Sequence, residues 1–133
     1  MGPFAVWLRS ASSTVLLRAL TCFIVDDSAR FLALASTLLE RHGIEVVGTA
    51  RSAAEALARV PELGPDVVLV DIDLGADSGF ELTRALTRGE RLSVILISAH
   101  AEADFTDLIQ ASPALGFIPK AELSARAVHA LRR

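Results

Sequence analysis

Short runs of apolar residues alternate with stretches of helical periodicity over most of this chain. The apolar runs predict β-strands, because each is short and is bounded by polar or turn-forming residues. The clearest run covers residues 67–70, where Val-Val-Leu-Val gives four consecutive residues that favour strands or burial. The predicted strands are residues 22–25, 44–50, 67–70, 94–97 and 116–118.

Helical spacing of apolar residues follows each predicted strand. Ser28 can cap the first helix, and Gly43 can end it. Ser-Ala-Ala-Glu at 52–55 is a capping box, which opens a second helix that ends near Pro61. Further helices are predicted at about residues 80–87, 102–110 and 123–133. The apolar positions that give the first helix its periodicity are Phe31, Leu34, Ala35, Leu38 and Leu39.

Five strand–helix units in this order predict an α/β sandwich with a parallel sheet. Parallel strands are covered on both faces, which agrees with a hydrophobic fraction of 52% and a mean hydropathy of +0.46. Right-handed crossovers bring the carboxyl ends of all strands to one edge of the sheet, where open α/β sheets bind ligands. A functional site is therefore expected at that edge.

Length, charge and cysteine content exclude several classes of protein. The 133 residues fit one domain, and no apolar run approaches the roughly 18 residues needed to cross a bilayer. A net charge of −3 and a pI of about 5.5 argue against a nucleic-acid surface. The single cysteine, Cys22, cannot form an internal disulfide, and no zinc-binding spacing is present. A reducing cytoplasm is the natural location.

Residues 1–20 differ from the rest and are interpreted as a leader, with the folded domain at 21–133. The leader has no acidic residue, and its apolar residues are scattered. Arginine and serine residues interrupt any signal-peptide core, and Val6 stands where N-myristoylation needs Ser or Thr. We expect this leader to be poorly ordered; a short helix or a partner-binding segment is the alternative.

Polar side chains stand at the ends of four predicted strands, namely Asp26, Asp27, Asp71, Ser98 and Lys120. All of them are expected at the same edge of the sheet. Three carboxylates there would repel one another and raise their pKa values unless a cation intervenes. Mg²⁺ commonly uses one or two carboxylates and keeps several waters. The sequence therefore predicts a Mg²⁺ site at this edge.

The same groups suit phosphoryl transfer to a carboxylate. A carboxylate can act as a nucleophile and form an acyl phosphate, provided that charge on the phosphoryl oxygens is compensated. The metal can cover one oxygen, the Lys120 ammonium a second, and the Ser98 hydroxyl with backbone N–H groups the third. Lys120 is the only lysine, since the other twelve basic residues are arginine. That bias supports a specific role for its compact charge.

From about residue 21 onward the chain resembles the receiver domain of bacterial two-component response regulators. The matching segments are Val-Asp-Asp at 25–27, Leu-Val-Asp at 69–71 with Gly79 eight residues on, Ile-Ser-Ala at 97–99 and Phe-Ile-Pro-Lys at 117–120. The resemblance covers everything but the leader. It implies a CheY-like, flavodoxin-like (βα)5 fold: a doubly wound five-stranded parallel sheet with strand order 2-1-3-4-5, flanked by helices.

By this resemblance Asp71 is the phosphoacceptor. Asp27 and Asp71 would bind Mg²⁺ directly, with the backbone carbonyl of Asp73 as a third protein ligand. Asp26 would act on the metal largely through water, and Lys120 would pair with the phosphoryl oxygens. The phosphoryl donor would be a phosphohistidine on a sensor histidine kinase.

The resemblance also implies a set of switch residues. Ser98 would turn toward the phosphoryl group, and Ala99 would leave access to it. Phe117 would be the aromatic switch residue, with an ordinary core position as the competing explanation. Asp73 and His100 stand at positions that modulate phosphoryl lifetime in this family.

Phosphorylation would change the face formed by the fourth helix, fifth strand and fifth helix, since it adds about −1.5 to −2 charge. That face would bind an unidentified downstream protein; a homodimer is also allowed. No direct nucleic-acid or membrane binding is expected. We expect a stand-alone receiver, and the alternative is the receiver part of a longer DNA-binding regulator whose output domain is absent.

Two other functions share part of this pattern. Asp-Ile-Asp at 71–73 is like the nucleophile motif of haloacid-dehalogenase-type phosphatases, but those carry it in the first strand and need a cap or larger core. A phosphorylation-independent interaction module would not need the intact acidic residues, hydroxyl and lysine. The expected chemistry is therefore self-phosphorylation and dephosphorylation in signalling, without enzymatic turnover.

Overall fold

A five-stranded parallel sheet forms the centre of the protein in the computed structural model, which describes residues 6–9, 14–89 and 92–132. The order across the sheet is β4 (Glu45–Ala50), β3 (Thr21–Val25), β5 (Val67–Asp71), β8 (Ser93–Ser98) and β9 (Gly116–Pro119). Counted along the domain, this is the order 2-1-3-4-5, with every pairing parallel. The predicted fold class is confirmed.

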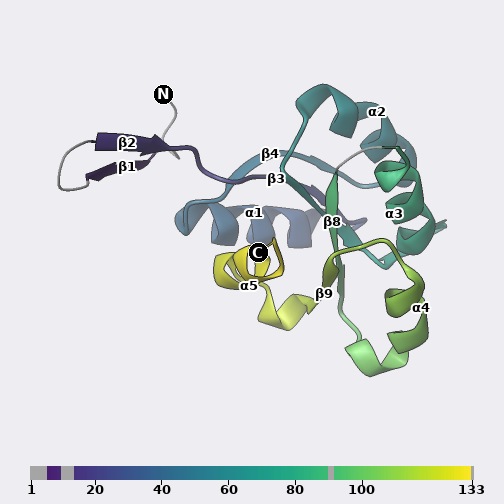
Figure 1. Ribbon diagram of the computed structural model, residues 1–133. Coiled ribbons are helices and arrows are strands. Elements are labelled where there is room, and N and C mark those ends of the chain that lie inside the picture. The colour runs from purple at the N-terminus through teal and green to yellow at the C-terminus, as the bar shows by residue number, and fades with distance from the viewer. Residues whose placement is uncertain (1–5, 10–13, 90–91, 133) are drawn as a thin grey trace.

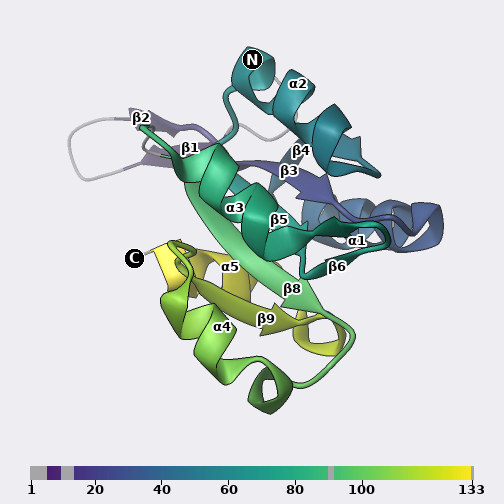
Figure 2. The ribbon, with the colours of Figure 1, turned by 90° about the vertical axis from the view of Figure 1, so that its right-hand side faces the viewer.

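Helices cover both faces of the sheet (Figures 1 and 2). One layer contains α1 (Ala29–Arg41) and α5 (Ala125–Arg132). The other contains α2 (Ala53–Leu63), α3 (Gly79–Thr87) and the short α4 (Thr106–Ala111). The central strands β3 and β5 are fully buried, as expected for strands packed between two helical layers. No helix in the described ranges is long and apolar enough to cross a membrane.

Serine side chains cap the first turns of α1 and α2. Ser28 Oγ accepts a hydrogen bond from the backbone N–H of Phe31 at 3.2 Å, as the sequence predicts for α1. The predicted capping box of α2 is present in half: Ser52 Oγ accepts from Glu55 N, but the Glu55 carboxylate accepts from the backbone N–H of Arg51, the residue before the cap, and not from that of Ser52. These caps fix the direction in which the chain leaves the carboxyl edge of the sheet.

The helix predicted at residues 102–110 is wrong as a single element. The structure has a 3₁₀ turn at Glu102–Asp104, and α4 begins only at Thr106. Phe105 separates the two, with φ −133° and ψ 16°, outside the helical region. Its half-buried ring lies 6.4 Å from that of Phe80 in α3, so tertiary packing overrides the local helical pattern here.

The last helix starts two residues later than predicted. A 3₁₀ turn at Lys120–Glu122 follows β9, and α5 begins at Ala125. Ser124 Oγ accepts from the backbone N–H of Ala127 at 3.0 Å, so a serine cap defines this start.

The apolar stripe of α1 is only partly buried. Leu32, Ala35 and Leu39 pack into the core, whereas Leu34 and Leu38 are 61% and 37% exposed. The helical periodicity predicted the element correctly, but the buried face is rotated relative to the full set of apolar positions.

Two small antiparallel hairpins form separate two-stranded sheets. One lies in the loop after β5 and pairs β6 (Asp73–Leu74) with β7 (Asp77–Ser78). The other pairs β1 (Val6–Arg9) with β2 (Thr14–Leu17) and extends away from the main sheet (Figure 1). The sequence predicted no strand in either place. Residues 1–5 and 10–13 lie outside the described residues, so the order of the leader and the boundary at residue 21 stay predictions.

Candidate functional site

Three carboxylates meet at the carboxyl edge of the sheet. Asp26 and Asp27 follow the end of β3, and Asp71 is the last residue of the neighbouring strand β5. One oxygen from each lies within 4.8 Å of the others, as a divalent ion would require. The convergence predicted from the strand ends is therefore present in the structure.

Asp26 is the most deeply buried of the three. Its Oδ1 accepts a hydrogen bond from Ser28 N at 2.9 Å, and its Oδ2 lies 2.6 Å from Lys120 Nζ. The side chain has no exposed surface, and Oδ2 accepts no hydrogen bond in the described part of the chain. The ionic contact with Lys120 therefore compensates a buried charge that would otherwise be costly.

Asp71 is the carboxylate whose ionisation the site disfavours most clearly. Burial, followed by repulsion from Asp26, raises the pKa of Asp71 from 3.8 to about 6. The Asp73 backbone N–H donates to Oδ1 at 3.1 Å and Lys120 Nζ donates to Oδ2 at 3.1 Å, and both contacts favour the charged form. A carboxylate with this pKa is mostly ionised at neutral pH.

Lys120 links two of the carboxylates from the end of β9. Burial lowers its pKa, but the contacts with Asp26 and Asp71 outweigh that effect, so the pKa of Lys120 is raised above 10.5. The Phe31 ring of α1 lies under the ammonium, with Nζ 4.4 Å from the ring centroid. The cation is thus held from three sides.

Asp27 differs from its neighbours because its side chain is exposed. A Cβ atom on Gly75 would lie 3.4 Å from Asp27 Oδ2, so the loop after β5 passes close to this carboxylate. The backbone carbonyl of Asp27 accepts two hydrogen bonds from the Arg51 guanidinium, at 3.1 and 2.9 Å. Asp27 is therefore fixed through its main chain.

Ser98 ends β8 beside this group. Its side chain is 1% exposed, and its Oγ accepts a hydrogen bond from His100 N at 2.9 Å. Ala99 and His100 are exposed on the loop that follows. The His100 ring lies 6.0 Å from that of Phe105 in an edge-to-face arrangement. The Ser98 hydroxyl thus lies at the carboxyl edge, where it accepts a hydrogen bond from the loop that follows β8.

The side chains of Phe117 and Asp73 are not part of the carboxylate cluster formed by Asp26, Asp27 and Asp71. Phe117 in β9 is half-buried and packs against the core under α2 and α3, so both the switch and the core explanation stay open. The Asp73 side chain is exposed, and only its backbone N–H contacts Asp71. The role of its carbonyl in metal binding stays a prediction.

Gly79 shapes the backbone beneath the phosphoacceptor candidate. Its N–H donates to Ile72 O at 2.9 Å, and a Cβ atom here would lie 2.1 Å from the Asp71 carbonyl oxygen. No larger residue fits without moving the end of β5. This explains why the sequence has glycine at the start of α3.

Sequence reasoning missed two neighbours of the site. Phe31 was interpreted only as an apolar helix position, although it lies one turn after Asp27 and contacts Lys120. Arg51 directly follows the end of β4, so its position at the carboxyl edge was a usable signal. Phe31 contacts the Lys120 ammonium, and Arg51 donates to the Asp27 carbonyl oxygen.

The donor chemistry of the site fits Mg²⁺. Carboxylate oxygens are hard ligands, and three of them approach one another within 4.8 Å at an edge open to water through Asp27. The described residues also hold Lys120 beside the same carboxylates, which leaves less negative charge for a second ion. One divalent ion is therefore the expected occupant.

Replacing Asp71 with asparagine is expected to stabilise the metal-free protein at neutral pH. Because the pKa of Asp71 is raised in the folded state, its ionisation costs folding free energy: the cost grows from pH 3.8 to about pH 6, is complete above pH 6, and is absent below pH 3.8, where both states are protonated. The variant should gain about 2 kcal/mol near pH 7.5, and the gain should vanish near pH 3.5. Urea unfolding with a chelator measures this.

Asp73→Asn is the matched control for that experiment, because Asp73 is exposed and should give no gain. An Asp71→Asn variant that is less stable than the wild type near pH 7.5 would contradict the electrostatic description of the site.

Solved structures with the same fold include proteins from signalling systems. The signal receiver domain of a modulated diguanylate cyclase from Desulfovibrio desulfuricans G20 is 29% identical with a TM-score of 0.72, covering 84% of this chain and 89% of that one. The response regulator domain of Thermotoga maritima CheB superimposes with a TM-score of 0.74 over 86% of this chain and 95% of that one. At 24% identity, this second likeness concerns the fold alone.

Among curated proteins, the protein-glutamate methylesterase/protein-glutamine glutaminase 2 of Koribacter versatilis (strain Ellin345) is 38% identical over 78 residues. These residues are 58% of this chain but 22% of that protein. The chain thus spans about a quarter of the length of the curated relatives it matches.

The family profile described as the response regulator receiver domain matches residues 22–132. That range contains the parallel sheet except Thr21, the first residue of β3, and every side chain of the carboxylate–lysine cluster. With the sheet order, the cluster and this match in agreement, the chain belongs to the response regulator receiver domain family.

Proposed function

We propose that this chain is a phosphorylation switch of a bacterial two-component system, acting in the cytoplasm, with Asp71 as the phosphoacceptor. The observation that carries the proposal is the arrangement around Asp71. Its carboxylate lies 3.1 Å from the Lys120 ammonium and shares a 4.8 Å cluster with Asp26 and Asp27. Phosphoryl transfer needs a nucleophile, a cation and carboxylates that bind the metal, and this arrangement offers all three.

In the proposed reaction, an Asp71 carboxylate oxygen attacks the phosphorus of a phosphohistidine on a sensor histidine kinase. The new bond joins Asp71 to phosphorus, the phosphorus–nitrogen bond breaks, and the imidazole takes up a proton. Mg²⁺ supplies charge compensation on the phosphoryl oxygens when it is bound. Asp27, Asp71 and the Asp73 carbonyl would hold it, and Asp26 would act through water.

In this proposal Lys120 also binds the phosphoryl group. Its ammonium already contacts Asp71, so it can move to a phosphoryl oxygen without a change of backbone. Its contact with Asp26 at 2.6 Å keeps it oriented during that exchange. In this proposal the chain forms and loses its own acyl phosphate and turns over no other substrate.

Ser98 and Phe117 would convert the acyl phosphate into a change of surface. The Ser98 hydroxyl must release the His100 backbone N–H before it can turn to the phosphoryl group. Phe117 would then repack on β9, Ala99 would leave the phosphoryl group accessible, and Asp73 and His100 would tune its lifetime.

The output surface in this proposal is formed by α4, β9 and α5. Leu108 of α4 and Leu115 of the following loop are 54% and 47% exposed, which suits a docking face for a downstream protein. A partner that binds the two states differently would shift the population between them. A homodimer through this face is a second proposed assembly, and direct nucleic-acid or membrane binding is not part of the proposal.

A receiver within a longer regulator is the alternative arrangement. The matched part of the methylesterase relative is only 22% of that protein, so its enzymatic activity is not assigned to this chain. The phosphorylation chemistry at Asp71 is the same in either arrangement.

Incubation with acetyl phosphate and Mg²⁺, followed by intact mass measurement, tests this function. We expect one phosphoryl group per wild-type chain, and none in Asp71→Asn or with a chelator. No label at saturating donor would instead favour a phosphorylation-independent interaction module. Continuous hydrolysis of small phosphate esters that depends on Asp73 would favour a phosphatase.

A further inference from the structure

The three carboxylates of the site are held in different ways. Those of Asp26 and Asp71 are each fixed by a backbone N–H group and by Lys120. The Asp27 carboxylate is exposed and accepts no hydrogen bond from the residues that the structure describes. Its position relative to the other two therefore depends on its own backbone.

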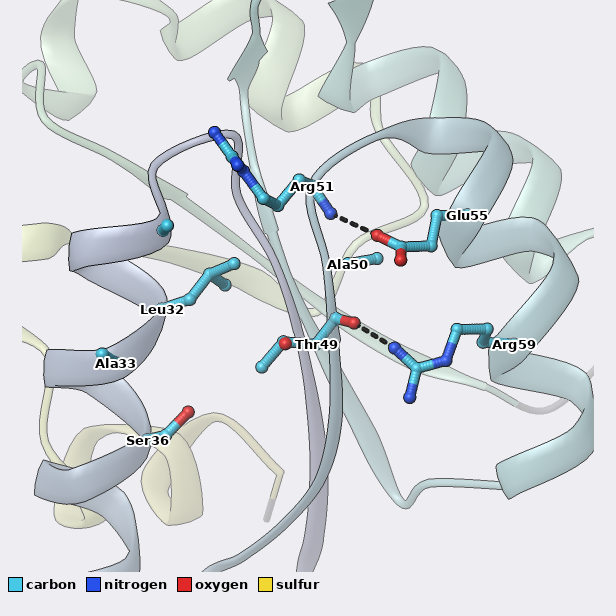
Figure 3. Close-up of a pocket in the computed structure, with 9 residues that line it drawn as sticks. Leu32, Ala33, Ser36, Thr49, Ala50, Arg51, Glu55 and Arg59 are labelled. Carbon is cyan, nitrogen blue, oxygen red and sulfur yellow. Dashed lines mark hydrogen bonds between the residues drawn. The ribbon is translucent and has the colours of Figure 1, made fainter.

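Arg51 holds that backbone from the neighbouring loop. Its Nε and Nη2 donate to the Asp27 carbonyl oxygen at 3.1 and 2.9 Å, so one edge of the guanidinium meets a single oxygen. In Figure 3 the Arg51 side chain extends toward the loop that begins α1, whereas Arg59 is directed toward Thr49. Arg51 and Arg59 both line the pocket drawn in Figure 3, but they contact different parts of the chain.

Hydrogen bonds in the turn between β4 and α2 fix the backbone of Arg51. Its backbone N–H donates to the Glu55 carboxylate at 2.7 Å (Figure 3). Ala53 N in the same turn donates to Asp77 Oδ2 at 3.0 Å, which ties the turn to the β6–β7 hairpin. Because the backbone of Arg51 is fixed in this way, its guanidinium can hold the Asp27 carbonyl in one position.

We propose that Arg51 is a positioning residue for Mg²⁺ binding, which sets the Asp27 carboxylate against those of Asp26 and Asp71. The inference rests on the proposed metal-dependent function. The direction of the change in Mg²⁺ affinity distinguishes this role from simple electrostatics. Removing a cation near the site would strengthen Mg²⁺ binding, whereas losing the positioning of Asp27 would weaken it. Groups that orient metal ligands typically change affinity by about 10–100-fold when removed.

Isothermal titration of the full chain with MgCl₂ tests the proposal in four proteins: wild type, Arg51→Ala, Arg51→Lys and Arg59→Ala. Arg51→Ala should weaken Mg²⁺ binding about tenfold. Arg51→Lys should lose less, because its ammonium keeps the charge and can still donate to the carbonyl, but it lacks the planar edge with two donor nitrogens. Arg59→Ala should bind like the wild type, since Arg59 contacts the Thr49 carbonyl and the Phe23 ring.

A second measurement uses phosphorylation by acetyl phosphate. The labelling rate of Arg51→Ala should approach that of the wild type once Mg²⁺ is saturating, because the defect lies in metal affinity. Unchanged or tighter binding in Arg51→Ala overturns the proposal, as does an equal loss in Arg59→Ala. If the wild type itself binds no Mg²⁺, the proposed function fails together with this inference; if only the Arg51 effect is absent, the function stands.

Discussion

Replacing Lys120 with methionine is expected to lower the free energy of unfolding by about 3 kcal/mol when divalent metal is absent. Asp26 Oδ2 is fully buried, and its one ionic partner in the described chain is Lys120 at 2.6 Å. Methionine keeps much of the side-chain volume and the contact with Phe31. The loss of unfolding free energy therefore measures the effect of removing the ammonium charge. Chemical denaturation near pH 7.5 with a chelator gives the value.

Two additional measurements assign that loss to the uncompensated carboxylates. Adding Asp26→Asn to Lys120→Met should recover much of the stability, because a neutral amide replaces the stranded charge. Mg²⁺ should also recover part of it, since a ligand that binds only the folded state stabilises that state. If Lys120→Met proves as stable as the wild type without metal, the ion pair does not hold the site together.

Replacing Gly79 with alanine should be about as damaging, with a loss of about 3 kcal/mol. The added Cβ would lie 2.1 Å from the Asp71 carbonyl oxygen and 2.7 Å from Ile72 Cα. These are backbone atoms, which no rotamer change can move. The end of β5 must therefore shift, and Mg²⁺ affinity should fall along with stability.

Gly43→Ala is the matched control for Gly79→Ala. Gly43 has φ +88°, but a Cβ added there would meet no atom of the described residues within 4 Å. Only backbone strain of about 1 kcal/mol is therefore expected at this position. Equal denaturation midpoints for the two variants would mean that the close approach to Asp71 carries no special cost.

The sheet and the core of the site could be predicted because both follow from local signals. Each central strand is an apolar run buried on both faces, and the polar residue after it must lie at the carboxyl edge. Asp26, Asp71 and Lys120 were therefore placed together without knowledge of any distance.

The features that escaped prediction depend on contacts between distant segments. Phe105 breaks a helical pattern because its ring packs against Phe80, which no local rule contains. Leu34 is exposed because the position of α1 on the sheet, not its own periodicity, decides which apolar residues are covered. The bond from Arg51 to the Asp27 carbonyl joins two loops 24 residues apart, so sequence spacing gave no hint of the pairing.

The location of the phosphoryl group tests the central claim most directly. The wild-type chain is treated with acetyl phosphate and Mg²⁺, the acyl phosphate is reduced with borohydride, and the peptides are mapped by mass spectrometry. We predict reduction at Asp71 alone, dependent on Mg²⁺. Reduction at another carboxylate, such as Asp27 or Asp73, or no reduced residue at saturating donor, would contradict the account.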